Sequence, residues 1–285
     1  MALAVITGAS SGIGAATAEL LAANGFQVIA AARRIDRLAE IAAKNKNIEA
    51  LQLDVTDQKS VDQFVEAINN RAIAVLINNA GGAFDSISIE KADPAVWQKT
   101  YEVNVIGALR ITKALLPNLR KNGKGHIVVI TSTAGHGVYE NGGSYTTAKH
   151  AELAFTQTLR LELNGEPIRV TEIAPGMVKT EEFSLNRLGD SASAEKVYEG
   201  VAAPLTAADI AEAIRWSVML PDHVNIDSSS AITETLETNI KEEINENSEI
   251  DQPKKQSFTS WLQKNQSSAE TIKDSNRDKD HITAL

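Results

Sequence analysis

Short apolar runs alternate with amphipathic stretches along most of the chain. Each run has the length of a buried strand, and the stretch after it has apolar residues at helical spacing. Such alternation predicts a doubly wound parallel sheet in a three-layer α/β/α arrangement, with ligands at the carboxyl ends of the strands. A first helix is expected to end at Asn24 and Gly25. Strands are expected at 3–6, 27–32, 49–53, 73–77, 127–131 and 168–173, and further helices at 36–45, 58–70, 94–116, 145–164 and 204–220.

A glycine-rich turn joins the first strand to the first helix. Its sequence is TGASSGIG at 7–14, with the spacing Gly-x-x-x-Gly-x-Gly instead of the commoner Gly-x-Gly-x-x-Gly. Glycines let the backbone approach a pyrophosphate, and the helix N-terminus offers free N–H groups and a positive dipole end. A tight turn without a ligand is the alternative, but it does not explain three glycines. We expect cofactor contacts from Gly8, Ser10, Ser11, Gly12, Ile13 and Gly14.

Two arginines follow the second strand, at the place where a dinucleotide fold holds the adenosine ribose. An acid at this place would bind the ribose 2′-hydroxyl, whereas an arginine accommodates a 2′-phosphate. Ala32 stands where the acid would be, and Arg33 and Arg34 come next. The expected cofactor is therefore NADP, with Arg33 as the main phosphate clamp and Arg34 as its helper. Two solvated charges at the start of a surface helix are the alternative.

Turns with polar residues or glycine follow three other strands. Asp54 could meet the adenine of the cofactor, and the turn at 78–81 could lie near its ribose. Asn and Gly also favour turns without any ligand, which is the alternative. The position at strand ends favours cofactor contact, which we expect from Asp54, Val55, Asn79, Ala80, Gly81, Pro175 and Gly176.

Tyr145 and Lys149 lie four residues apart, so on a helix they share one face. A free tyrosine titrates near pH ~10 and exchanges protons at neutral pH only if a neighbour such as Lys149 favours its phenolate. Ser132, at a strand end facing the same helix, can bond the oxygen that Tyr145 protonates, which suits carbonyl–alcohol interconversion. A polar helix opening is the alternative. Asn104, in the helix at 94–116, belongs to a structural or a catalytic network.

Composition narrows the class of protein. The 285 residues allow one large α/β domain or two small ones, and 43% apolar with 23% charged residues is an ordinary globular balance. A net charge of -9 argues against nucleic-acid binding. The absence of cysteine excludes disulfides, thiolate metal sites and cysteine nucleophiles, and no metal site is expected. No signal peptide or membrane-spanning run is evident, so a soluble cytoplasmic protein without membrane contact is expected.

Taken together, these motifs resemble the classical short-chain dehydrogenase/reductase family over about residues 1–227. The resemblance rests on TGASSGIG at 7–14, NNAG at 78–81, Asn104, Ser132, Tyr145 with Lys149, and PG at 175–176. It implies a Rossmann-type fold and an NAD(P)-linked oxidoreductase. It also implies that Tyr145 is the general acid/base, that Lys149 holds the nicotinamide ribose and lowers the Tyr145 pKa, that Ser132 positions the substrate oxygen, and that Asn104 fixes a water that relays protons. Val178 and Thr180 would bind the nicotinamide carboxamide.

The chain is further similar to the branch of NADP-dependent 3-hydroxy acid dehydrogenases that act on serine and allo-threonine. This similarity rests on Arg33 with Arg34, on RLELNGEPIRV at 160–170, on PGMVKTEEF at 175–183 and on LPDHVNI at 220–226. An acidic substrate needs a cation, for which His136 and Lys179 are the candidates. Substrate contacts are expected from Ser132, His136, Tyr139, Tyr145 and Met177. Surplus apolar residues on the helices at 94–116 and 145–164 suggest a homo-oligomer, a dimer or tetramer.

Two segments depart from the repeating pattern. Residues 181–203 have no clear periodicity and are expected to form a flap over the cleft. Residues 228–285 are polar, contain no glycine and are expected to be a mostly disordered tail with one possible short helix, so that the domain ends at 227 and the last strand is lost or shortened. The main hypothesis is an NADP-dependent carbonyl reductase or alcohol dehydrogenase. The alternative is a non-catalytic NADP-binding module whose tail recruits a protein.

Overall fold

The structure, a computed structural model, describes residues 1–199, 201 and 203–233. The described residues through Thr233 belong to one compact unit. The possible short helix of the tail rests on an apolar residue at every fourth position, and a second apolar cluster follows it. Apart from Ile232, the residues of the stripe and of the cluster lie outside the described residues: Leu236, Ile240 and Ile244, and Phe258, Trp261 and Leu262. None of the described helices has the length and apolar content needed to cross a bilayer.

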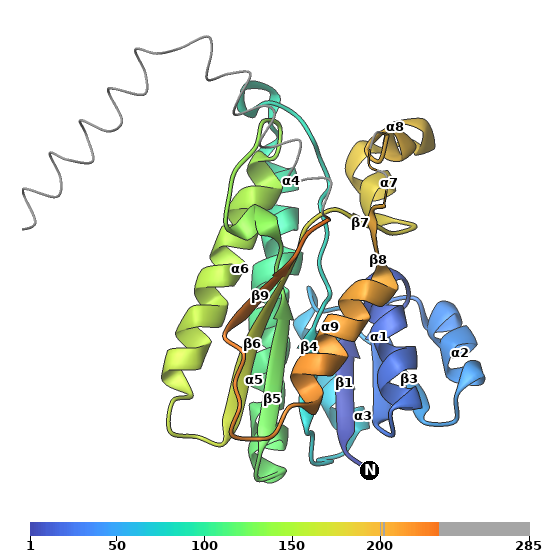
Figure 1. Cartoon of the computed structure of the whole chain (residues 1–285), viewed down its shortest axis with the longest axis vertical. Coiled ribbons are helices and arrows are strands. Elements are labelled where there is room, and N and C mark those ends of the chain that lie inside the picture. Colours follow the sequence, from blue (N-terminus) through green and yellow to red (C-terminus); the bar gives the residue numbers. More distant parts are fainter. Residues whose placement is uncertain (200, 202, 234–285) are drawn as a thin grey trace, which may run out of the picture. The chain divides into compact units, whose positions relative to one another are not determined.

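Seven parallel strands form the central sheet in the order β3-β2-β1-β4-β5-β6-β9 (Figure 1). The strand order reverses between β1 and β4, which is where a doubly wound sheet opens its ligand crevice. This arrangement confirms the predicted fold class. The bounds are β1 Leu3–Thr7, β2 Gln27–Ala32, β3 Ile48–Gln52, β4 Val75–Asn78, β5 Gly125–Ile130, β6 Ile168–Pro175 and β9 Ser228–Ala231.

Helices cover both faces of the sheet because successive strand residues point to opposite sides. Val5 and Leu76 pack in one core with the helices α3 Gln58–Ile68, α5 Gly107–Lys121 and α6 Gly143–Glu162. Ile6 and Ile77 pack in the other core with α1 Gly12–Ala23, α2 Ile35–Lys44 and α9 Ala207–Met219. The three-layer prediction is therefore confirmed.

The last strand is present as a short strand, and it lies beyond residue 227, where the domain was expected to end. Residues Ser228–Ala231 form β9, which pairs in parallel with Glu172–Pro175 of β6. Gly176 N donates to Ala231 O at 2.7 Å, and Ser228 Oγ donates to Glu172 Oε2 at 2.6 Å. Three serines lack the apolar side chains typical of a strand, but backbone pairing needs none.

The predicted helix at 94–116 is two helices joined by a wider turn. α4 spans Pro94–Tyr101, a π-helical segment spans Glu102–Ile106, and α5 continues past Pro117 to Lys121. Asn104 lies inside the π-helical segment. Such segments occur frequently at functional sites because they redirect side chains and backbone groups.

The expected flap at 181–203 contains regular structure. It includes α7 Phe183–Leu188 and α8 Ser191–Lys196. On either side, β7 Val178–Lys179 pairs with β8 Leu205–Thr206. Two short 3-10 turns complete the elements, η1 Ile89–Lys91 and η3 Thr133–Gly135.

Candidate active site

The glycine-rich turn is packed against the turn that follows β4. Gly8 and Gly12 have positive φ angles of 65° and 53°, which side chains rarely adopt. A Cβ on Gly8 would lie 2.9 Å from Ala80 Cα. The hydroxyl Thr7 Oγ1 accepts hydrogen bonds from the backbone N–H groups of Asn79 and Ala80, each at 3.0 Å. The Thr7 hydroxyl therefore ties the turn after β4 to the glycine-rich turn.

The first turn of α1 keeps its N–H groups available. Its N-cap, Ser11, makes no side-chain capping bond, and no acidic residue lies in the first turn. A Cβ on Gly14 would lie 2.4 Å from Gly8 O, so only glycine allows this close approach. Uncapped N–H groups at the positive end of a helix dipole, behind a cradle without side chains, suit a pyrophosphate.

Arg34, rather than Arg33, contacts the glycine-rich turn. Arg34 Nη2 donates to Ser10 Oγ at 2.9 Å and to Ser11 Oγ at 3.2 Å. Its Nη1 pairs with Glu182 Oε1 at 2.6 Å, and this bond keeps the pKa of Glu182 below its usual range. Arg33 is exposed, and its carbonyl accepts a bond from Gln52.

Asn104 is fully buried and bonded to two backbone segments. Its Nδ2 donates to Gly82 O at 2.8 Å and to Thr100 O at 2.7 Å, and its Oδ1 accepts from Gly82 N at 3.2 Å. A Cβ on Gly81 would lie 2.6 Å from Asn104 Oδ1 and 3.5 Å from Lys149 Nζ. Gly81 therefore lets Asn104 and Lys149 lie next to each other.

Lys149 is buried beneath the tyrosine that precedes it by one turn. Its Nζ donates to Ile130 O at 3.0 Å and to Glu152 Oε2 at 2.6 Å, and it lies 5.7 Å from the centre of the Tyr145 ring. Burial lowers the Lys149 pKa, but the charges of Glu152 and Tyr145 outweigh it, so the net direction is upward. Lys149 is therefore cationic at neutral pH.

Tyr145 and the turn of Ser132 meet at the carboxyl ends of the strands. Ser132 Oγ accepts a bond from Ala134 N at 3.1 Å and donates to Pro175 O at 3.3 Å. Ala134 shares a buried cluster with Ala83 and Tyr145. The structure thus brings Tyr145, Lys149, Asn104 and the Ser132 turn to one edge of the sheet.

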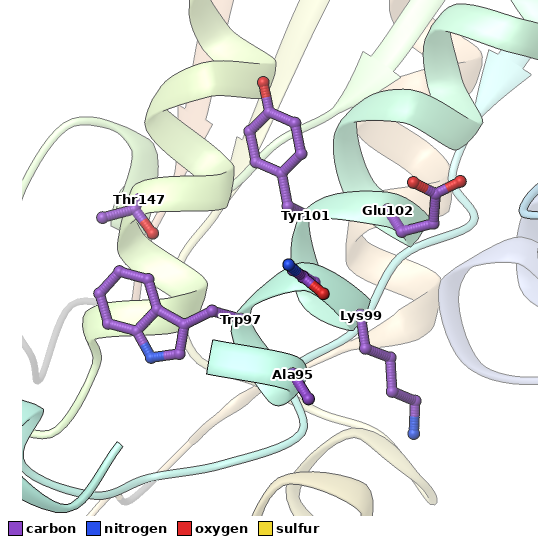
Figure 2. A pocket seen from close by; sticks show the side chains of 7 residues that line it. Ala95, Trp97, Lys99, Tyr101, Glu102 and Thr147 are labelled. Atoms are coloured by element: carbon purple, nitrogen blue, oxygen red, sulfur yellow. The ribbon is translucent and has the colours of Figure 1, made fainter. Parts of the chain in front are cut away.

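A hollow on the surface of the described residues lies away from these side chains. α4 contributes Trp97 and Tyr101 to this hollow, the π-helical segment contributes Glu102, and α6 contributes the exposed Thr147 (Figure 2). None of the predicted site residues lines this hollow. Tyr145 and Lys149 are buried on the other side of α6. The hollow is therefore not the catalytic cleft.

The family comparison fits this geometry. The sequence profile described as short chain dehydrogenase matches residues 2–188, a range that includes every predicted site residue. The chain belongs to the short-chain dehydrogenase family.

Relatives refine this family membership. An uncharacterised oxidoreductase of Mycobacterium tuberculosis is 50% identical over 226 residues, which is 79% of this chain and 88% of the relative. An NADP-dependent 3-hydroxy acid dehydrogenase of Salmonella typhi is 37% identical over 230 residues, 79% of this chain and 92% of the relative. A solved closed form of serine dehydrogenase complexed with NADP+ has a TM-score of 0.78 at 35% identity, and the match covers 82% of this chain and 95% of that one.

Several predicted cofactor contacts of this short-chain dehydrogenase have structural roles of their own. Asp54 Oδ1 accepts bonds from Thr56 N at 2.9 Å and Thr56 Oγ1 at 2.7 Å, which is turn chemistry. Val55 packs on Gly107, and Gly176 binds β9. Val178 pairs with Leu205 in the small β7–β8 sheet. Among the expected contacts after β6, Thr180 lies nearest the glycine-rich turn, 3.4 Å from where a Cβ of Gly12 would be.

Both cations expected for an acidic substrate are already paired with carboxylates. His136 Nε2 lies 2.8 Å from Glu172 Oε1, and Lys179 Nζ lies 3.2 Å from Glu195 Oε2. These pairs argue against either side chain as the substrate's cation. Met177 is half-buried between β6 and β7, and Tyr139 is 42% exposed.

A third cation, Arg187, was missed from the sequence. Its guanidinium lies 5.3 Å from the Tyr139 ring, so the expected Tyr139 contact lies beside it. Arg187 follows Phe183 by four residues on α7, and the Phe183 ring meets the Tyr145 ring edge-on at 5.4 Å. The four-residue spacing of an aromatic residue and an arginine was the available signal.

Proposed function

We propose that this short-chain dehydrogenase interconverts the secondary alcohol of short 3-hydroxy acids and the corresponding carbonyl, using NADP and Tyr145 as general acid/base. The observation that carries the proposal is the convergence of Tyr145, Lys149 and Asn104 with the Ser132 turn, beside the glycine-rich turn. A non-catalytic NADP-binding module, the alternative, does not require these four groups in one place.

The residues present fit NADP. The side-chain-free cradle of Gly8 and Gly14 and the uncapped start of α1 suit the pyrophosphate. Arg34, with Ser10 and Ser11, offers a guanidinium and two hydroxyls of the kind that bind a phosphate monoester. When bound, the nicotinamide exchanges a hydride with the substrate carbon.

Each polar side chain of the site has a separate role in moving the substrate proton. In the oxidation direction Tyr145 takes the hydroxyl proton, and the buried Lys149 ammonium favours the phenolate that can do so. Ser132 holds the substrate oxygen by a hydrogen bond. Asn104 is held by Gly82 and Thr100, so it keeps the π-helical segment and the β4 turn in register behind Lys149.

Arg187 supports an acidic substrate. Its Nε is buried without a hydrogen-bond partner, and Arg187 pairs with no carboxylate within the residues that the structure describes. Its Nη2 donates to Ser86 Oγ at 3.1 Å, which leaves further donors. A carboxylate on the substrate would satisfy this cation while the hydroxyl-bearing carbon lies at Tyr145. Relatives named as 3-hydroxy acid and serine dehydrogenases are consistent with this class.

A paired set of substrates tests the proposal. L-Serine and 3-hydroxybutyrate are assayed beside their methyl esters with both nicotinamides, on the wild type and on Arg187→Met and Lys179→Met. We expect NADP-dependent oxidation of the acids, and a KM for the acids roughly 10–100-fold higher in Arg187→Met, because a charge-assisted bond is lost. The esters and the Lys179→Met control are expected to change little. Equal use of acids and esters by the wild type would contradict the substrate class.

We also propose that a second copy of the chain covers the outer face of α4 and α5. Tyr101 of α4 lines the hollow of Figure 2 and is 43% exposed, and Leu109 of α5 is 45% exposed. Leu109→Glu should then lower the molecular mass in light scattering, while the exposed Leu161→Glu should not. An unchanged mass would contradict this assembly.

A further inference from the structure

Glu152 carries a buried carboxylate for which the proposed chemistry has no use. It follows Lys149 by three residues on α6, and its side chain is 2% exposed. A buried carboxylate is costly unless it is paired, and Lys149 is its only cationic partner in the described part of the chain. The bond from Lys149 Nζ to Glu152 Oε2 is 2.6 Å long. The two side chains therefore form one charged unit.

The contacts of Lys149 fix the direction of its ammonium group. One of its three N–H donors reaches Glu152 and another reaches Ile130 O, at the end of β5 and two residues before Ser132. Gly81 lies on a further side, since a Cβ there would be 3.5 Å from Nζ. Without Glu152, the Ile130 carbonyl would be the one hydrogen-bond acceptor left to the ammonium among the residues that the structure describes.

We propose that Glu152 is a positioning residue of the active site, which holds the Lys149 ammonium in place and partly offsets the charge that it presents to Tyr145. The inference rests on the proposed function of Tyr145 as the group that takes the substrate proton. Glu152 touches neither substrate nor cofactor in this account and acts through Lys149. When Glu152 takes up a proton, its negative charge no longer offsets the positive charge of Lys149. Lys149 then stabilises the Tyr145 phenolate more strongly.

Few ionisable groups face Glu152. On its own helix this is Lys149, on which the charge of Tyr145 also acts. From the packed strand β6 it is Glu172, which is itself buried and bonded to His136 Nε2 at 2.8 Å. Glu172 disfavours a second negative charge, whereas Lys149 favours it.

The protonation of Glu152 changes in the neutral range. Burial raises the pKa of Glu152 to about 7, with Glu172 acting in the same direction and Lys149 against it. Below this pH Glu152 is neutral and the full charge of Lys149 acts on Tyr145. Above it the carboxylate offsets that charge, so the phenolate forms less readily. A neutral glutamine at 152 therefore imitates the protonated state at every pH.

The acidic limb of the pH–rate profile tests this role. kcat/KM for oxidation of L-serine or 3-hydroxybutyrate with NADP+ is measured against pH for the wild type, Glu152→Gln and Glu152→Asp. The midpoint should fall by about one pH unit in Glu152→Gln, because a unit charge near the phenol has been removed. It should fall by less in Glu152→Asp, whose carboxylate is kept but withdrawn from the ammonium.

Glu162→Gln is the matched control, since it removes the same charge from an exposed position on the same helix. The proposal would be overturned if the midpoint of Glu152→Gln equals that of Glu162→Gln or lies higher. Replacing a glutamate with a purely structural role would lower the rate without moving the midpoint. If Glu152→Gln does not fold, as judged by circular dichroism, the Glu152→Asp shift decides.

A second readout separates this inference from the proposed function. Titration of tyrosinate absorbance, with the spectrum of Tyr145→Phe subtracted, follows the phenol without any turnover. A wild type that oxidises none of the substrates would contradict the proposed function. The same downward shift of the tyrosinate midpoint in Glu152→Gln would still support the link from Glu152 through Lys149 to Tyr145, and its absence would overturn that link.

Discussion

At the scale of single residues, a buried histidine makes the stability of the fold sensitive to acid. His126 on β5 is 2% exposed, its Nε2 lies 2.8 Å from Thr171 Oγ1, and its Nδ1 is buried without a partner. Burial, helped by the charge of Arg169, lowers the pKa of His126 from 6.5 to about 3. The folded chain therefore binds this proton more weakly than the unfolded chain.

The sign of the effect on stability follows from this difference. The contribution of a neutral His126 is present above the unfolded pKa and is lost as the pH falls below it. Between about pH 7.5 and about pH 5 the free energy of unfolding should fall by about 2 kcal/mol through this group. In His126→Gln that part of the loss should be missing in urea denaturation. An equal loss in both proteins would contradict the assignment.

Side-chain contacts between residues far apart in the sequence could not be predicted from the sequence. The spacing of Tyr145 and Lys149 is visible along the chain because both lie on one helix. The bond of Arg34 to Glu182 joins residues 148 positions apart, and that of His136 to Glu172 joins strand and loop. Periodicity within one element carries no information about such contacts, so the sequence could not predict that Arg34 contacts the glycine-rich turn.

At the scale of elements, β9 makes a clear contribution at the sheet edge. It pairs with four residues of β6 and places Ser228 Oγ on the buried Glu172 carboxylate. Two shortened chains, ending at 233 and at 227, both lack residues 234–285 and differ only in β9 and the two residues after it. We expect the shorter chain to melt roughly 5–10 °C lower, because several backbone bonds and one buried partner are lost. Equal melting temperatures in differential scanning calorimetry would contradict this.

Glu182, in the segment between β7 and α7, pairs with Arg34, the arginine that we propose for the 2′-phosphate. Glu182 contacts Arg34 with both oxygens, at 2.6 and 2.9 Å, and accepts a bond from Ser11 Oγ at 3.1 Å. A bound phosphate has to replace this carboxylate. Glu182→Gln should therefore bind NADPH roughly three- to five-fold more tightly, the effect expected for a partly exposed ion pair.

The controls for this prediction are a neighbouring residue and a second cofactor. Glu181→Gln alters only an exposed pair with Arg37 at 3.4 Å and should leave NADPH binding unchanged. Binding of NADH, which lacks the 2′-phosphate, should change less than that of NADPH in Glu182→Gln. Weaker NADPH binding in fluorescence titration would show instead that Glu182 itself holds the cofactor.

At the scale of the whole molecule, the regular alternation of strands and helices was enough to predict the architecture. The buried parallel strands read as continuous apolar runs, and the glycine-rich turn marked where the first helix begins. Two features that the sequence did not predict lack a periodic pattern of apolar residues. They are the serines of β9 and the π-helical turn around Asn104. Both depend on contacts with other elements, which hold backbone in place regardless of local propensity.

The central claim is that one phenol carries the proton chemistry of this molecule, and Tyr145→Phe tests it most directly. The substitution removes a single oxygen and keeps the ring against Phe183 and the buried cluster. We expect NADPH binding close to that of the wild type and loss of substrate turnover, by roughly 100-fold or more, as is typical when a general acid/base is removed. Turnover near the wild-type rate in Tyr145→Phe, with NADPH bound, would contradict the account.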